Sequence, residues 1–472
     1  MASQDLAYLP ARALGQLIAS REVSAQEVAR SFLERIERLN PRLNAYLTVT
    51  ADLALEQARA ADEALARGQR LGPLHGVPVS IKDLFFTKGV RTTAGSLVYQ
   101  DHVPQHDSIV AERLRQAGAV LLGKTNTPEF GMSGSTENRL GGPCRNPWDP
   151  SRTAGGSSGG AAAAVAAGLG PLAIGSDGGG SIRIPSSFCG IYGLKPTRGV
   201  VPRYGGFGRP VFNPLSHLGP MTRTVEDAAL LLRAIAGFDR RDPNALRHTP
   251  PDYLAGLHDG VRGLKMAWSP NLGYAPVDPE VAQAAAKAAR AFEELGATME
   301  EPGLAIEEPG FYFTISAANS YAAYGDLLEQ KGDLLTEYAR DGIARGAAVT
   351  GAEYARAVRQ MEELTVTVDE WLQRFDILLT PTMPVVAFPI EQFPSQIGGR
   401  AIQEPRRGFI PFTYPFNMTG HPAATVPCGF SADGLPIGLH IIGAKDADAL
   451  VLRVSAAFEE ARPWAHRRPQ GF

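Results

Sequence analysis

The chain has 472 residues, 44% hydrophobic and 20% charged, which is an ordinary globular composition with enough apolar residues for a large core. Its 46 basic and 49 acidic residues give a formal charge of −3, so we expect no nucleic-acid or membrane surface as partner and a small molecule as ligand. The cysteines Cys144, Cys189 and Cys428 form no close pair, which disfavours disulfides and a Cys-x-x-Cys metal site. Since no long apolar run or secretory signal is evident either, we expect a cytoplasmic protein without a membrane span.

The N-terminal part, residues 1–70, is expected to form helices that pack on the core. Ser24 and Glu27 have the spacing of a capping box and predict the start of a helix, which should stop at Pro41. A further helix is predicted over residues 51–67. We assign these helices to packing and expect no chemistry in them.

A lysine at the end of a core strand is the first candidate for chemistry. Residues 77–81 are apolar enough for a buried strand, and Lys82 follows it directly. A solvent-exposed lysine is the ordinary alternative, but lysine is rarely buried without a purpose. The amphipathic segment 109–123, which ends in a strand at 120–122, adds the alternation of strand and helix typical of an α/β sheet.

Two glycine-rich serine loops, residues 155–160 and 175–181, enclose the most distinctive stretch of the chain. Between them, residues 161–167 are a strong helix-forming segment closed by Gly168, and residues 171–174 predict a short buried strand. A flexible linker is the alternative for such a composition, but a linker has no reason to fold between its own halves. Glycine at this density lets backbone N–H groups approach a ligand, as in an oxyanion hole.

One motif within these loops favours a different interpretation. Residues 155–159 match G-x-S-x-G, which would make Ser157 the nucleophile of an α/β-hydrolase elbow. Such an elbow must follow an apolar strand, and we expect residues 146–152 to form none. Neither loop continues as a phosphate-binding P-loop. The nine histidines form no ligand cluster, so we expect no metal and no cofactor.

The second half of the chain predicts the surroundings of the site. A glycine- and proline-rich loop with Tyr204, Phe207 and Phe212 is expected at its mouth, and a largely helical region over residues 300–375 is expected to cover it. Further elements are predicted as a helix over 225–236 capped by Thr224, a helix over 279–295, strands at 377–379, 423–427 and 438–443, an irregular loop over 381–411 and a closing helix over 446–460.

Taken together, these residues resemble the amidase signature family. The similarity runs through HGVPVSIKD (75–83), STEN (135–138), NPWDPSRTAGGSSGG (146–160), GSDGGGSIRIPSSFCGIYGLKPTRG (175–199), HLGPMTRTVEDAALLL (217–232) and PFNMTGHPAATVPCGF (415–430). It implies an α/β amidase signature fold, with a large mixed β-sheet flanked by helices on both faces. It also implies a single domain over residues 1–472, with its signature core at 75–240.

The resemblance assigns roles to several of these residues. Lys82 would be the catalytic lysine, Ser157 the bridging serine after a cis peptide bond, and Ser181 the acylated nucleophile. The oxyanion hole would use the backbone N–H groups of Gly178, Gly179, Gly180 and Ser181. Many members carry threonine or another side chain where this chain has Gly178, which is a departure that affects the pocket more than the chemistry.

Further residues are expected to support this centre or to bind substrate. Ser158 would cap the alanine-rich helix and orient the lysine, while Asp177 and Arg183 would hold the nucleophile loop. The expected substrate pocket consists of Met132, Ser133, Tyr204 and Phe207. Because no histidine is placed as a base, the lysine must act in its neutral form, which burial favours.

The predicted function is a serine amidohydrolase that cleaves the C–N bond of a small apolar or aryl carboxylic amide through an acyl-enzyme, with esters or carbamates as further substrates. We expect a monomer or homodimer. The alternative is the A subunit of a glutamyl-tRNA(Gln) amidotransferase, which would release ammonia from glutamine within a complex. A non-catalytic scaffold is disfavoured because every residue that the chemistry needs is present.

Overall fold

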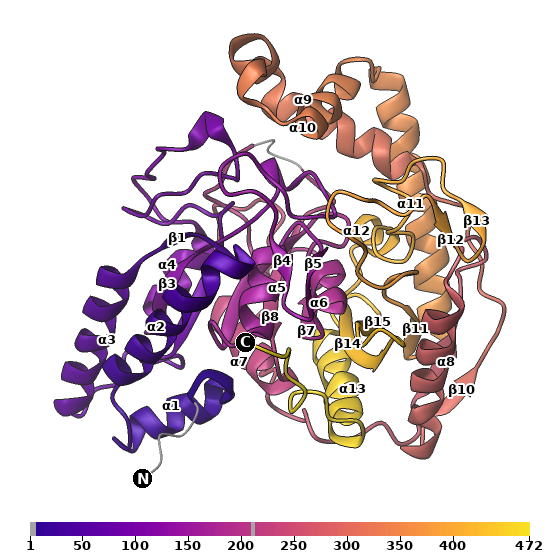
Figure 1. Cartoon of the computed structure of the whole chain (residues 1–472). Coiled ribbons are helices and arrows are strands. Elements are labelled where there is room, and N and C mark those ends of the chain that lie inside the picture. Colours follow the sequence, from indigo (N-terminus) through magenta and orange to yellow (C-terminus); the bar gives the residue numbers. More distant parts are fainter. Residues whose placement is uncertain (1–5, 209–212) are drawn as a thin grey trace.

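The computed structural model describes residues 6–208 and 213–472, and a single eleven-stranded mixed sheet runs through it (Figure 1). The strand order is β1-β3-β2-β6-β8-β7-β14-β15-β11-β9-β10. These strands are β1 (Tyr46–Val49), β2 (Pro78–Lys82), β3 (Val120–Thr125), β6 (Leu172–Asp177), β7 (Tyr192–Lys195), β8 (His217–Thr222), β9 (Lys265–Trp268), β10 (Thr298–Glu300), β11 (Ile377–Pro381), β14 (Ala423–Phe430) and β15 (Pro436–Gly443). Two small hairpins stand apart from it, β4 (Arg145–Asn146) with β5 (Asp149–Thr153) and β12 (Gln396–Ile397) with β13 (Arg400–Ala401).

Helices lie on both faces of this sheet. They are α1 (Ala11–Ala19), α2 (Ala25–Leu43), α3 (Ala51–Ala66), α4 (Ile109–Gln116), α5 (Gly159–Ala166), α6 (Arg183–Cys189), α7 (Val225–Ile235), α8 (Pro279–Glu294), α9 (Phe311–Lys331), α10 (Glu337–Ala347), α11 (Gly351–Arg374), α12 (Pro415–Thr419) and α13 (Asp448–Ala461). Figure 1 shows α1 to α3 at one side of the molecule and the α9–α10 pair projecting beyond the sheet.

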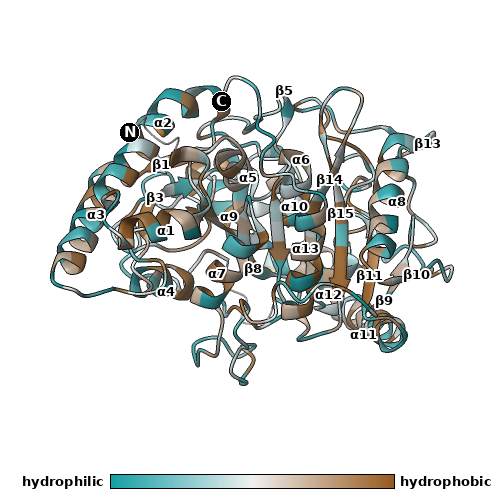
Figure 2. Ribbon diagram, turned by 90° about the horizontal axis from the view of Figure 1, so that it is seen from below, coloured by the Kyte–Doolittle hydropathy of each residue, from teal (hydrophilic) through white to brown (hydrophobic). Residues whose placement is uncertain are grey.

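The two faces are built by the alternation of side chains along each strand. Leu172 and Ile174 of β6 pack in one hydrophobic cluster with α4, α7, α8 and α13, whereas Ala173 between them packs with α2 and α5 on the opposite face. In β11, Ile377 and Leu379 share the first cluster, and Leu378 faces α11 and α12. Figure 2 shows the resulting hydrophobic strands inside, with hydrophilic residues along outer helices such as α3 and α8. The predicted fold class, a mixed sheet flanked by helices on both faces, is confirmed.

The N-terminal helices predicted from the sequence are present, but one of their boundaries differs from the prediction. The capping box of Ser24 and Glu27 is present at the start of α2. The expected stop at Pro41 is wrong by two residues, because the helix continues to Leu43 and ends at Asn44, whose backbone is left-handed. The strand β1, which pairs antiparallel with β3, was not expected.

Several strands carry no clear signal in the sequence. The strand β8 has the sequence HLGPMT, whose glycine and proline suggest a loop, yet it pairs with β6 along its full length. Residues 149–153, from which no strand was expected, form β5 and pair with β4. This hairpin lies outside the main sheet, so it does not supply the apolar strand that a nucleophile elbow requires.

Candidate active site

The amine of Lys82 lies in a fully buried pocket of hydroxyl groups. Lys82 ends β2, which runs parallel to β6, so the carboxyl ends of the two strands lie side by side. Its Nζ is 2.6 Å from Ser157 Oγ, 3.0 Å from Ser158 Oγ and 2.9 Å from Ser176 Oγ. Burial lowers the pKa of Lys82 well below its ordinary value, and the Asp177 carboxylate raises it by a smaller amount. A neutral amine is therefore favoured.

Two serines position this amine. Ser158 precedes α5 but makes no capping hydrogen bond with its side chain, so the expected cap is wrong. Its hydroxyl instead donates to the Ser176 carbonyl at 3.2 Å and accepts from Lys82 Nζ at 3.0 Å. Ser176, at the end of β6, was not predicted. A serine at a strand end gives no local signal of its own, and only the parallel pairing brings it to Lys82.

Ser157 and Ser181 come from the two predicted loops and line the same cavity. The peptide bond between Gly156 and Ser157 is cis, as the resemblance implied. Ser181 is held near Ser157 by its own carbonyl, which accepts from the Ser158 N–H at 3.1 Å. No hydrogen bond joins the Ser181 hydroxyl to Ser157 or to any other residue within the described ranges.

The turn before Ser181 has its carbonyls fixed by side chains from distant elements. The Asp177 carbonyl accepts from Asn417 Nδ2 at 2.8 Å, the Gly178 carbonyl from the Tyr312 hydroxyl at 3.0 Å, and the Gly179 carbonyl from Thr413 Oγ1 at 2.6 Å. In a trans peptide the next residue's N–H points away from the carbonyl. These three contacts therefore set the directions of the N–H groups of the turn.

Three of the four N–H groups predicted for an oxyanion hole have no partner in the described part of the chain. They belong to Gly178, Gly179 and Ser181, all of which line the cavity. The prediction is wrong for Gly180, whose N–H donates to Asp177 Oδ1 at 2.7 Å and is not offered to a ligand. A side chain at Gly179 would collide with Tyr312, and one at Gly178 would meet open space.

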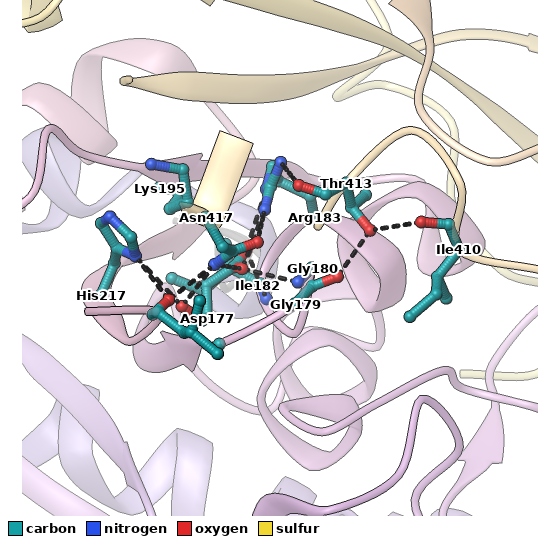
Figure 3. A network of polar contacts seen from close by, with 12 residues as sticks. Asp177, Gly179, Gly180, Ile182, Arg183, Lys195, His217, Ile410, Thr413 and Asn417 are labelled. Atoms are coloured by element: carbon teal, nitrogen blue, oxygen red, sulfur yellow. Dashed lines mark hydrogen bonds and ion pairs between the residues drawn. The ribbon is translucent and has the colours of Figure 1, made fainter. Parts of the chain in front are cut away.

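Asp177 and Arg183 form a buried ion pair that braces this turn (Figure 3). Arg183 donates to both carboxylate oxygens of Asp177 at 2.9 Å, and it also donates to the Thr413 carbonyl and to Asn417 Oδ1. Burial alone would raise the pKa of Asp177. The charge of Arg183 and the hydrogen bonds from Arg183 and Asn417 together lower it by a larger amount, so the pKa is held below its ordinary value. Asp177 thus contacts the loop at Gly180, Ile182 and Arg183, while Tyr312, Thr413 and Asn417 are further partners of the loop that the sequence did not predict.

The serines open into a cavity of about 500 Å³. All four residues predicted for the pocket, Met132, Ser133, Tyr204 and Phe207, line it. Phe207 packs edge-on against Phe86 and close to Tyr99, with ring centroids 5.0 and 4.3 Å apart. The remaining mouth residue of the sequence prediction, Phe212, lies outside the described residues.

Only part of the predicted helical cover, residues 300–375, lines the cavity. The helices α9 and α10 and the loop before α12 line the cavity, through residues such as Tyr312, Phe313, Tyr338 and Ile410. α11 contributes no lining residue, so the cover is shorter than the expected 300–375. Among residues 6–208 and 213–472 no group of three histidine, cysteine or acidic side chains could hold a metal ion, and no helix is long and apolar enough to span a membrane.

The fold and the buried lysine beside paired serine loops define an α/β protein with a lysine–serine site. The Amidase family model matches residues 27–452. An acylamidase of Rhodococcus erythropolis is 42% identical over 99% of this chain and 98% of its own length, and the A subunit of the glutamyl-tRNA(Gln) amidotransferase of Moorella thermoacetica is 41% identical over 99% of both. A crystal structure of a bacterial aryl acylamidase of the amidase signature enzymes superposes with a TM-score of 0.91 at 36% identity, over 97% of each chain. The chain belongs to the amidase signature family and is an amidase-family hydrolase.

Proposed function

We propose that this hydrolase cleaves the C–N bond of small apolar or aryl carboxylic amides to acid and amine, with Ser181 as the acylated nucleophile. Esters and carbamates would be accepted by the same acyl chemistry. The observation that carries the proposal is the buried amine of Lys82 among three hydroxyls, next to a turn with three unpaired N–H groups. The apolar and aromatic lining around Met132 and Phe207 supports the apolar substrate class.

The hydrogen-bond pattern supports Ser157 as the proton carrier. The Ser158 hydroxyl donates to the Ser176 carbonyl, so it can only accept from Lys82. A neutral amine has two N–H donors and one lone pair. With Ser158 and one further hydroxyl accepting from these two N–H groups, the lone pair is left for a hydroxyl proton. We assign this proton to Ser157, whose oxygen makes the shortest contact with the amine, at 2.6 Å compared with 2.9 Å for Ser176.

The proposed reaction follows from this arrangement. With a substrate in place, the Ser181 hydroxyl passes its proton to Ser157 as Oγ attacks the amide carbon, and Ser157 passes its own proton to Lys82. The N–H groups of Gly178, Gly179 and Ser181 stabilise the oxyanion, where one such donor is typically worth roughly 3–4 kcal/mol. The same path reversed protonates the leaving amine as the C–N bond breaks, and water then releases the acid from Ser181.

A direct comparison of two substrates tests the proposal. The purified protein should hydrolyse acetanilide faster than glutamine, and Lys82→Ala should remove the activity without unfolding the protein. Faster release of ammonia from glutamine would contradict the substrate class and favour the role of an amidotransferase component.

An amidotransferase component remains the second candidate function, because the Moorella thermoacetica relative is 41% identical over 99% of both chains. Co-purification with partner subunits distinguishes the two candidate functions, since we propose a monomer or homodimer that acts alone.

We also propose that residues 1–472 work as one domain, with strands of the single sheet drawn from Tyr46 to Gly443. The three free cysteines support a cytoplasmic location.

A further inference from the structure

Three arginines of the cavity lining form neither an ion pair nor a side-chain hydrogen bond within the described residues. They are Arg345 of α10 and Arg406 and Arg407 of the loop before α12. Within residues 6–208 and 213–472 none of them forms an ion pair. Arg406 and Arg407 instead lie over aromatic rings, Arg407 at 4.7 Å from the centroid of Phe313.

The guanidinium groups of Arg345 and Arg407 are close enough to influence each other. Burial lowers the pKa of Arg407, the positive charge of Arg345 lowers it further, and Glu404 offsets part of this effect. A side-chain carbon built at Gly342 would lie 3.9 Å from Arg345 Nη2 and 4.0 Å from Met132 Sδ, so Arg345 extends to the wall that carries Met132. Solvent screens these partly exposed charges, and an anion bound between them reduces their remaining repulsion.

Arg241, another arginine of the cavity lining, forms ion pairs with carboxylates. Arg241 pairs with Asp239 at 2.7 Å and with Glu112 at 2.8 Å. The charge of Arg241 is thus compensated by two carboxylates, whereas no described carboxylate pairs with Arg345, Arg406 or Arg407. Arg203, also in the lining, forms no ion pair either, but its side chain donates to the Asn213 carbonyl at 3.2 Å.

The chemistry of the guanidinium group indicates the ligand. It presents N–H donors in a planar fork that matches two oxygens of an oxyanion, and a carboxylate is the simplest organic group of this kind.

We propose that the cavity binds amides that also carry an anionic group, with Arg345, Arg406 and Arg407 as the binding site of this group and the apolar part of the substrate against aromatic lining residues such as Phe207. The inference rests on the proposed function and narrows its substrate class to anionic amides, of which a carboxylate is the simplest.

Two pairs of matched substrates test this, because the charge could sit on the acyl or on the amine side. The first pair is N-phenylsuccinamate and its terminal carboxamide, and the second is 4-acetamidobenzoate and 4-acetamidobenzamide. In at least one pair the carboxylate should have a kcat/KM about tenfold higher than the carboxamide, as expected for a charge-assisted contact. This ratio should fall as salt is added, since the arginines are partly exposed.

Variants then locate the effect. Arg345→Gln and Arg407→Gln should each lower the ratio of carboxylate to carboxamide kcat/KM, and the double variant should bring this ratio near one. Arg340→Gln removes the same charge from an exposed position of α10 outside the cavity and should leave the ratio unchanged. Hydrolysis of the carboxamides reports that each variant is folded.

Several outcomes would overturn the inference. These are a ratio at or below one in both pairs, a ratio that persists in the double variant, or a ratio insensitive to salt. The salt titration uses the unmodified protein and decides even if a variant fails to fold. Failure to hydrolyse any of the four amides or acetanilide would instead contradict the proposed function itself.

Discussion

Replacing Lys82 by methionine tests whether the amine is neutral in the folded protein, independently of activity. Methionine fills a similar volume and removes the titrating group. In the unfolded chain a lysine has a pKa of about 10.4, whereas burial holds the pKa of Lys82 well below its ordinary value in the fold. Between these two pKa values the unfolded chain binds one proton more than the folded one.

The sign and size of the effect follow from this difference. Because the unfolded state gains the proton as pH falls, the stability of the wild type relative to Lys82→Met decreases on acidification and increases toward alkaline pH. For one proton the slope is about 1.4 kcal/mol per pH unit, or about 2.7 kcal/mol between about pH 7 and pH 9. Lys124, whose pKa is lowered to about 8, and the buried Lys195 are present in both proteins and cancel in the difference.

The assay is urea denaturation of both proteins at several pH values, followed by tryptophan fluorescence. Equal m-values for the two proteins at each pH ensure that the difference in unfolding free energy reports Lys82. A difference that stays constant within about 0.5 kcal/mol from about pH 7 to pH 9 would mean that Lys82 is charged in the fold. The mechanism would then lose its base.

Three further substitutions test the base Lys82, the buried ion pair of Asp177 with Arg183, and the cavity at Gly178. Lys82→Arg should be folded but inactive, since a guanidinium stays charged, and measurable amidase activity would contradict the neutral-amine mechanism. Asp177→Asn should lower the free energy of unfolding by about 3–5 kcal/mol, because it leaves Arg183 buried without its counter-charge, and a thermal melt near that of the wild type would refute this role. Gly178→Thr should fold normally, because a side chain there meets open space, and should slow bulky anilides more than acetanilide, while equal slowing of both would argue against an effect on cavity size.

The residues that carry a local signal in the sequence are those that it singles out. Lys82 follows an apolar run, and Ser157 and Ser181 lie in glycine-rich loops, so each carries a local signal of the chemistry. The fold class followed in the same way, from strand and helix alternation and from motifs spread along the chain. These signals depend on a few neighbouring residues, which is why a single sequence was enough.

The parts that depend on tertiary pairing were not predictable. Ser176 reaches Lys82 only because β2 and β6 run parallel, and Tyr312 and Thr413 reach the turn before Ser181 from more than one hundred residues away. Gly180 was expected to share the role of its neighbours. Its N–H is oriented by the Gly179 carbonyl, which Thr413 turns toward itself, and this leaves the N–H facing Asp177.

The central claim is that Ser181 carries the acyl group while Ser157 passes the proton, although only Ser157 lies in a G-x-S-x-G match. Ser181 follows the turn with the unpaired N–H groups, and Ser157 contacts Lys82 at 2.6 Å. The most direct measurement is reaction with a fluorophosphonate and mapping of the adduct by peptide mass spectrometry in the wild type, Ser157→Ala and Ser181→Ala. We predict label on Ser181, slowed in Ser157→Ala and absent from Ser181→Ala. Label on Ser157 that survives in Ser181→Ala would contradict the assignment and restore the α/β-hydrolase interpretation.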